Sequence, residues 1–266
     1  MTNPNSLLLN VLFLAAGFGT RLGETGKKTA KGLFKNGVGQ TIIDLLIKDL
    51  KQFSFIKDYA LVTNNHFYQQ YQNHRDQNYP TLNLKIINDG ANNPENRLGA
   101  IADLILALNT LNWWDKNVLV LPSDTTANSI LPKFIKFSQQ HPNSFNTVLK
   151  VTTKEKIKNK RGCGIIDQHN CMTDFVEKPS DPPSNLASVP FYVYSQKSLK
   201  LLKKYKVNRE AREGTLGYQQ SNKNMDAPGN IIPWLLENNF PVHVYITEEK
   251  TIDIGSLEEL KKFQKK

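Results

Sequence analysis

The 266-residue chain is long enough for one large domain, and its 39% hydrophobic residues suffice for a sizeable core, so wholesale disorder is not expected. The formal net charge of +10 comes from lysines and arginines scattered along the chain, which favours a solvated basic surface over nucleic-acid binding. Two cysteines are too few for a disulfide framework, and no stretch reaches the roughly 20 apolar residues of a membrane span; we therefore expect a soluble, cytoplasmic protein with reduced thiols.

The first predicted element is an apolar strand near the N-terminus. Leu7–Ala16 resembles the hydrophobic region of a secretion signal, but no basic side chain precedes it and Asn10 interrupts it. Residues 11–16 are apolar throughout, which is typical of a central parallel strand buried on both faces. The run also leads directly into a glycine-rich loop, so we interpret it as a strand.

Strands and helices then alternate along the first two thirds of the chain. Helical spacing of apolar residues predicts helices, and short β-rich runs predict strands. The expected elements are helix 41–53, strand 59–64, helix 66–74, strand 82–87, helix 98–111 and strand 117–122. This alternation predicts βαβ units and a largely parallel sheet.

The pattern changes after about residue 146. Two β-rich runs around residues 168–170 suggest a hairpin or mixed sheet. The polar segment 206–225 is interpreted as a mobile loop that could serve as a lid. A helix at 230–238, a strand at 241–247 and an amphipathic helix from Ser256 complete the prediction, and no internal repeat is present.

The segment Ala15–Leu22 (AAGFGTRL) is a glycine-rich loop that follows the first strand, where backbone N–H groups can hold phosphate oxygens. A dinucleotide-binding fingerprint fits poorly, because the third glycine comes one place late and no helix is indicated directly after it. A P-loop fits poorly too, since the first glycine and the hydroxyl position are missing around Lys27. The third interpretation is a basic nucleotide loop, in which Arg21 and a later lysine meet a triphosphate.

The run LAAGFGTRL, followed by Lys31 in KTAKGL, resembles the signature of nucleoside-diphosphate-sugar pyrophosphorylases, which are sugar-1-phosphate nucleotidyltransferases. Further blocks resemble the family in the same order: 95–101 (ENRLGAI), 121–124 (LPSD), 162–167 with 174–179 (DFVEKP), 184–187, 226–234 and 251–255 (TIDIG). The resemblance implies an α/β fold: a Rossmann-like three-layer sandwich with a mostly parallel central sheet and a smaller mixed sugar-binding section. It implies one domain over 1–266, with a nucleotide-binding part at about 8–145, a sugar-phosphate-binding part at 146–255 and a C-terminal helix at 256–266.

The resemblance also implies roles for individual residues. Arg21 and Lys31 would be catalytic, and Asp124 and Asp253 would bind Mg²⁺. The nucleotide would contact a set of residues from the glycine loop and beyond: Leu14, Ala15, Ala16, Gly17, Gly19, Thr20, Arg21 and Gly99. The sugar phosphate would contact a second set: Gly162, Glu177, Lys178 and Asn185. The expected reaction joins an NTP to a sugar 1-phosphate, with no nucleic-acid or membrane partner and the oligomeric state left open.

Some of these residues have simpler explanations. Asp124 could cap a helix, and Glu177–Lys178 could be an exposed ion pair worth under about 1 kcal/mol. The chain also departs from the family pattern at four positions: Ala30 stands for a proline, Arg161 for a tyrosine, Pro190 for a glycine and Thr251 for a tryptophan. None of these removes a charged catalytic group, but they predict an unusual sugar pocket.

Three alternatives remain. An alkyl phosphate such as phosphocholine could be the acceptor, with CTP as donor. A non-catalytic nucleotide-sugar-binding homologue is a second alternative, although such a protein would be expected to have lost Lys31, Asp124 or Asp253. A dehydrogenase is the third and most distant.

Overall fold

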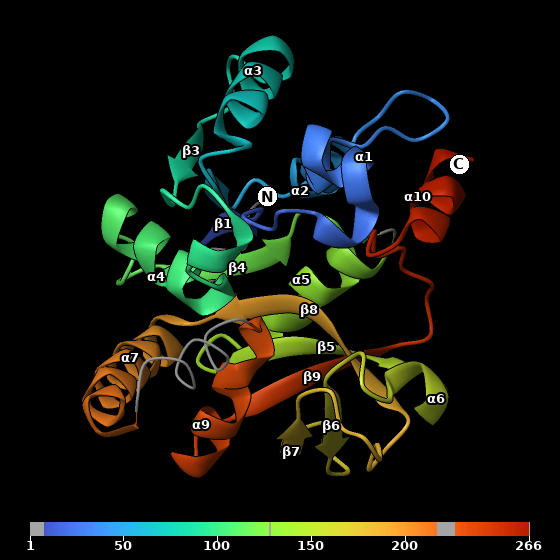
Figure 1. The fold of residues 1–266 in the computed structure, drawn as a ribbon. Helices are drawn as coiled ribbons and strands as arrows, with labels where there is room; N and C mark the ends of the chain where they lie inside the picture. Colours follow the sequence, from blue (N-terminus) through green and yellow to red (C-terminus); the bar gives the residue numbers. More distant parts are fainter. Residues whose placement is uncertain (1–7, 128, 217–226, 266) are drawn as a thin grey trace.

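The structure is a computed structural model that describes residues 8–127, 129–216 and 227–265. It is a three-layer α/β sandwich in which one large sheet lies between two layers of helices (Figure 1). This is the predicted fold class.

The central sheet has the order β3–β2–β1–β4–β8–β5–β9. Its strands are β1 (Leu9–Leu14), β2 (Ile56–Thr63), β3 (Leu84–Asn88), β4 (Asn117–Pro122), β5 (Phe145–Val151), β8 (Leu186–Tyr194) and β9 (Val242–Thr247). Only β8 runs against the other strands of this path, so the sheet is mostly parallel. The hairpin of β6 (Cys163–Ile166) and β7 (Met172–Val176) branches off through a pairing of β6 with β8.

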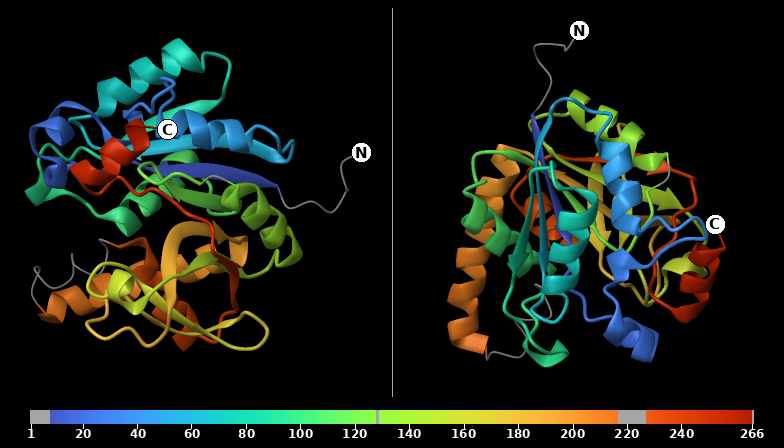
Figure 2. Two further views of the ribbon diagram at one scale, coloured as in Figure 1. Left: turned by 90° about the vertical axis from the view of Figure 1, so that its right-hand side faces the viewer. Right: turned by 90° about the horizontal axis from the view of Figure 1, so that it is seen from above.

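The two helical layers follow from how side chains alternate along the strands. In β1, Val11 and Phe13 belong to one buried core and Leu12 to the other, so this strand is buried on both faces as predicted. One face is covered by α2 (Ile42–Leu50), α3 (Tyr68–Asn78), α5 (Ile130–Gln140) and α10 (Leu257–Gln264). The other is covered by α4 (Ala100–Leu111), α7 (Gln196–Leu216) and α9 (Ile231–Glu237). Seen from above, α2 and α10 lie on one side of the sheet and α4 and α7 on the other (Figure 2).

Most predicted elements are confirmed with shifted ends, but two expectations are corrected and some elements were not predicted. The predicted loop at 206–225 is helical in its first part, because α7 continues to Leu216, and residues 217–225 lie outside the described part of the chain. A short helix, α1 (Gly23–Lys28), follows the glycine loop where no helix was indicated. The antiparallel strand β8 and the helix α5 were not predicted from the sequence.

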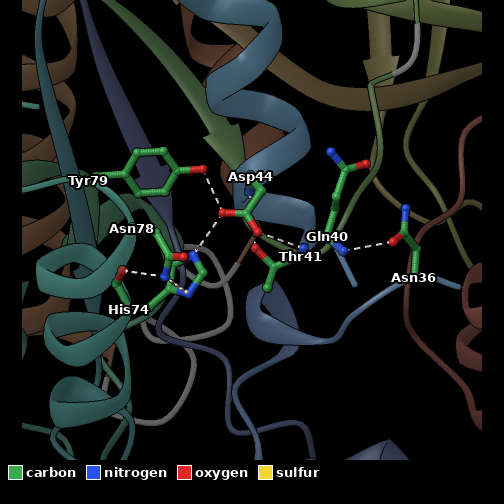
Figure 3. A network of polar contacts seen from close by, with 7 residues as sticks. All are labelled: Asn36, Gln40, Thr41, Asp44, His74, Asn78 and Tyr79. Carbon is green, nitrogen blue, oxygen red and sulfur yellow. Dashed lines mark hydrogen bonds and ion pairs between the residues drawn. The ribbon is translucent and has the colours of Figure 1, made fainter. Parts of the chain in front are cut away.

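A polar network joins the start of α2 to the end of α3 (Figure 3). Thr41 caps α2 through a capping box with Asp44, and the same carboxylate accepts hydrogen bonds from Tyr79 (2.6 Å) and His74 (2.9 Å). Burial would raise the pKa of Asp44, but the hydrogen bonds from His74, Tyr79 and Thr41 outweigh it and hold that pKa well below its usual range. The network fixes two helices on one face of the sheet and lies apart from the cavities described next.

Candidate active site

The glycine loop leaves the carboxyl end of β1 and enters a 3-10 turn, η1 (Thr20–Leu22). Gly19 has a left-handed backbone with φ of 66°, and its carbonyl oxygen would lie 2.2 Å from a Cβ placed on Gly26. The two backbones touch, so both positions require glycine. The side chain of Asn64, after β2, donates to the carbonyl of Ala16 (2.9 Å) and holds the start of the loop.

Lys31 lies next to Asp124 although 93 residues separate them in the sequence. Its Nζ is 2.9 Å from Asp124 Oδ2, and both side chains are largely buried, with 20% and 25% of their surfaces exposed. The adjoining Gly32 makes this approach possible, because a Cβ there would lie 2.9 Å from the carbonyl oxygen of Ser123 at the end of β4. The turn η2 (Lys31–Leu33) is thereby placed against the strand that leads to Asp124.

Asp253 is brought beside Asp124 by short β-bridge pairing between two distant loops. Thr125 pairs with Asp253, and the N–H of Ile254 donates to the carbonyl of Asp124 (2.9 Å). Burial, followed by the charge of Asp124, raises the pKa of Asp253 to about 6, while Arg161 and Lys31 act in the opposite direction. Two neighbouring carboxylates of this kind suit a divalent cation.

A charged cavity of about 340 Å³ opens around these groups. Seven of the predicted site residues line it: Arg21, Lys31, Asp124, Gly162, Glu177, Lys178 and Asp253. They come from the glycine loop, η2, the end of β4, the β6–β7 hairpin region and the segment before α10. The structure therefore brings together the predicted catalytic, metal and most of the predicted sugar-phosphate residues.

Glu177 lines this cavity beside Lys178 and close to Gly162. Burial raises the pKa of its carboxyl, and the nearby Lys178 (3.7 Å) opposes that rise. A Cβ on Gly162 would lie 3.0 Å from Glu177 Oε2 and 2.4 Å from Phe175 Cζ, so only glycine fits there. Because Gly162 has no side chain, the Glu177 carboxylate remains accessible from the cavity, where it can accept hydrogen bonds from hydroxyl groups.

A second, more apolar cavity of about 270 Å³ adjoins the first and shares Asp124, Pro190 and Pro228 with it. Four of the predicted nucleotide residues line it: Leu14, Ala16, Gly17 and Gly99. Gly99 precedes α4 with φ of 94°, a conformation that favours glycine. The two cavities thus form one cleft with an apolar and a charged compartment that meet at Asp124.

Four predicted residues do not line either cavity. Ala15 is buried, and its N–H donates to Val62 of β2. Gly19 is buried against the backbone of Gly26, and Thr20 is exposed. Asn185 is also exposed, with its carbonyl bonded to Thr152.

Sequence reasoning missed several lining residues. The apolar compartment also contains Arg97, Asp103 and Pro122, and the charged compartment also contains Lys160, Ser188, Tyr192 and Gly229. Arg97, Pro122 and Gly229 lie in blocks that resemble the family, which was a signal for them. Ser188 and Tyr192 belong to β8, the strand that the sequence pattern did not predict, so their contribution could not be found from the pattern.

Comparison with known proteins agrees with this geometry. The family model for nucleotidyl transferases matches residues 10–265. A glucose-1-phosphate adenylyltransferase of Clostridioides difficile is 25% identical over 261 residues, which is 94% of this chain and 64% of that protein. One of Clostridium botulinum is 31% identical over 146 residues, 54% of this chain and 34% of that protein. This chain therefore spans less than two thirds of the length of these curated relatives.

A solved structure shares the fold. A Bacillus anthracis protein, described as a glucose-1-phosphate thymidylyltransferase and crystallised with sucrose, superimposes with a TM-score of 0.76 at 17% identity. The match covers 96% of this chain and 94% of that one. Within the described residues, no helix is long and apolar enough to cross a membrane.

Proposed function

Because this chain belongs to the nucleotidyl transferase family, we propose that it transfers the nucleotidyl group of an NTP to a sugar 1-phosphate and releases pyrophosphate. The observation that carries this proposal is the pair of adjoining compartments that share Asp124. An apolar compartment suits a base and ribose, and a charged one suits reacting phosphates. Their junction is where the α-phosphate of a bound NTP would lie.

In the proposed reaction, a phosphate oxygen of the acceptor forms a bond to the α-phosphorus of the NTP. The bond from that phosphorus to the bridging oxygen breaks, and pyrophosphate leaves with the electron pair. The acceptor phosphate is ionised at neutral pH and needs no general base. Catalysis then depends on positioning and on neutralising charge, which are roles for Arg21 and Lys31 in the charged compartment.

Asp124 and Asp253 have the chemistry to hold Mg²⁺. Both line the charged compartment, and the raised pKa of Asp253 indicates excess negative charge there. Two carboxylates suffice, because Mg²⁺ usually keeps several waters and binds substrate phosphates. When bound, the ion would neutralise phosphate charge and orient the phosphates for displacement.

On the acceptor side, Glu177 would accept hydrogen bonds from sugar hydroxyls, and Lys178 would bind the acceptor phosphate. Lys178 is held with φ of 49°, which directs the chain sharply after Glu177. A carboxylate in this cavity can accept hydrogen bonds from a polyhydroxylated acceptor. It would also attract the quaternary ammonium group of phosphocholine, so the acceptor panel below includes both classes.

The test is a pyrophosphate-release panel that crosses ATP, UTP, CTP and dTTP with several sugar 1-phosphates and with phosphocholine. We expect turnover with at least one sugar 1-phosphate, loss of turnover in EDTA and recovery on addition of Mg²⁺. Turnover with phosphocholine alone, or none with any pair, would reject the proposal. Full activity in metal-free buffer would reject the role given to Asp124 and Asp253.

A further inference from the structure

The edge of the charged compartment carries an unusual concentration of positive charge. Residues 150–161 contain five lysines and one arginine but a single acidic residue, Glu155. The pKa of Lys150 is lowered by burial and then by Arg161, Lys156 and Lys250, so these cations lie close enough to repel one another. Folding alone does not favour such a cluster.

Arg161 is the member of this cluster that enters the cavity with a rigid, forked donor group. It is partly buried and lines the charged compartment beside Gly162. Its guanidinium makes no hydrogen bond or ion pair with any residue that the structure describes, whereas Lys31 pairs with Asp124 and Lys178 with Glu177. The charge of Arg161 does act on Asp253, whose pKa it lowers, but Asp253 is one of the two carboxylates proposed to bind Mg²⁺. A partly buried guanidinium whose N–H groups bind no described residue is suited to an anionic ligand.

The charges that line the cavity indicate which part of the substrate Arg161 would bind. Lys160, Arg161 and Lys178 all line the compartment. Arg161 directly precedes Gly162, where a Cβ would lie 3.0 Å from Oε2 of Glu177, the carboxylate proposed to bind sugar hydroxyls. One acceptor phosphate can be bound by Lys178, and Asp253, the carboxylate on which Arg161 acts, can be bound by Mg²⁺. Arg161 and the exposed Lys160 then remain for a further anionic group.

We infer that the acceptor carries a second oxyanion besides its 1-phosphate, and that Arg161 binds it. The inference rests on the proposed function, since it specifies the acceptor of the same site. A guanidinium presents paired N–H donors that match a carboxylate or a phosphoryl group in a two-point contact. The acceptor class is therefore a sugar 1-phosphate that also bears a carboxylate or a second phosphate.

The experiment compares three acceptors that differ in this substituent: glucose 1-phosphate, glucuronic acid 1-phosphate and glucose 1,6-bisphosphate. Calorimetry with Mg²⁺ and a non-hydrolysable NTP analogue gives binding, and pyrophosphate release gives turnover. The variants are Arg161→Gln and Arg161→Lys. Lys154→Gln is the matched control, because it removes one charge from the same basic segment at an exposed position that does not line the cavity.

We expect wild-type protein to bind one of the doubly anionic acceptors at least tenfold more tightly than glucose 1-phosphate. Arg161→Gln should weaken that acceptor by roughly tenfold to a hundredfold and glucose 1-phosphate by less than about threefold. Arg161→Lys should recover part of the loss, and Lys154→Gln should behave like wild type. The better anionic acceptor identifies the substituent.

Equal weakening of all three acceptors by Arg161→Gln would overturn the inference, because the arginine would then bind the shared 1-phosphate. Wild-type preference for glucose 1-phosphate would overturn it as well. If sugar 1-phosphates without a second anionic group are turned over and Arg161→Gln changes neither binding nor turnover, this inference is rejected and the proposed function still holds. Arg161-dependent binding without turnover of any acceptor supports the inference about the ligand and rejects the proposed reaction.

Discussion

Asp253→Asn is expected to make the protein more stable at pH 8 and less active. Burial and the charge of Asp124 raise the pKa of Asp253 from an ordinary 3.8 to about 6, so folding favours the protonated carboxyl. The stabilising contribution of Asp253 is complete below about pH 4, and it is lost as the pH rises through about 6. Above that range the ionised carboxylate opposes folding, whereas asparagine stays neutral.

The size of the effect follows from the shift. A rise of about two pKa units corresponds to about 3 kcal/mol at most, and partial exposure of Asp253 reduces this. For a chain of this length the expected gain in melting temperature is roughly 5 °C at pH 8. The gain should shrink between pH 6 and pH 4, because the wild-type carboxyl takes up its proton in the folded state.

Thermal unfolding followed by circular dichroism from pH 4 to 8, with and without MgCl₂, measures the effect. Mg²⁺ at pH 8 should stabilise wild type more than Asp253→Asn, because the variant lacks one of the two carboxylates. Asp181→Asn, at an exposed position with no described partner, should follow wild type throughout. A variant that is no more stable than wild type at pH 8 would refute the charge argument, and equal Mg²⁺ stabilisation of both would refute the metal assignment.

Three further predictions concern other residues. Lys31→Ala should fold normally and lose roughly a hundredfold in kcat, since it would remove a contact to charge that develops in the transition state. Lys35→Ala, at an exposed position, is the control, and a near-normal kcat of Lys31→Ala in pyrophosphate release would contradict the catalytic role of Lys31. Lys178→Asn should raise KM for the acceptor by about tenfold and leave KM for NTP unchanged; asparagine is chosen because it tolerates the left-handed backbone at this position. Equal increases in both KM values would contradict the assignment of Lys178 to the acceptor phosphate. Asp44→Asn should lower the free energy of unfolding in urea by about 2 to 4 kcal/mol at pH 7, and this loss should become smaller below about pH 4, where Asp44 of the unfolded chain becomes protonated. The control Asp76→Asn, at a side chain that is 62% exposed, should leave the free energy of unfolding unchanged. An unchanged urea midpoint for Asp44→Asn would contradict the role of the network.

The parts of the fold that were predictable are those with local periodicity. The β1 run and the helix α4 carry their burial pattern in consecutive residues, so the pattern located both. The strand β8 differs, because it crosses the sheet against its neighbours and is fixed by pairing with β4 and β5. The helix α7 was not predicted, and its second half was interpreted as a loop because the residues after 205 are polar and contain glycine.

The site was predictable where its residue types are chemically distinctive. Charged residues such as Lys31, Asp124 and Asp253 were named through resemblance, and the structure places them in one cavity. Their spacing alone could not show that Lys31 pairs with Asp124, because that contact depends on Gly32 meeting the end of β4. Asn185 was named from the same resemblance, yet it lies exposed outside the cavity.

The position of Asp124 explains why the site tolerates charges that oppose folding. Asp124 belongs to both compartments, pairs with Lys31, and through its backbone holds the loop that carries Asp253. The β-bridge keeps the two carboxylates together even though their repulsion raises the pKa of Asp253. A cation that binds both carboxylates would remove that repulsion, so its binding would be favoured by the same arrangement. The same holds for Arg161 with the opposite sign: the repulsion among the cations around it favours an acceptor that brings additional negative charge.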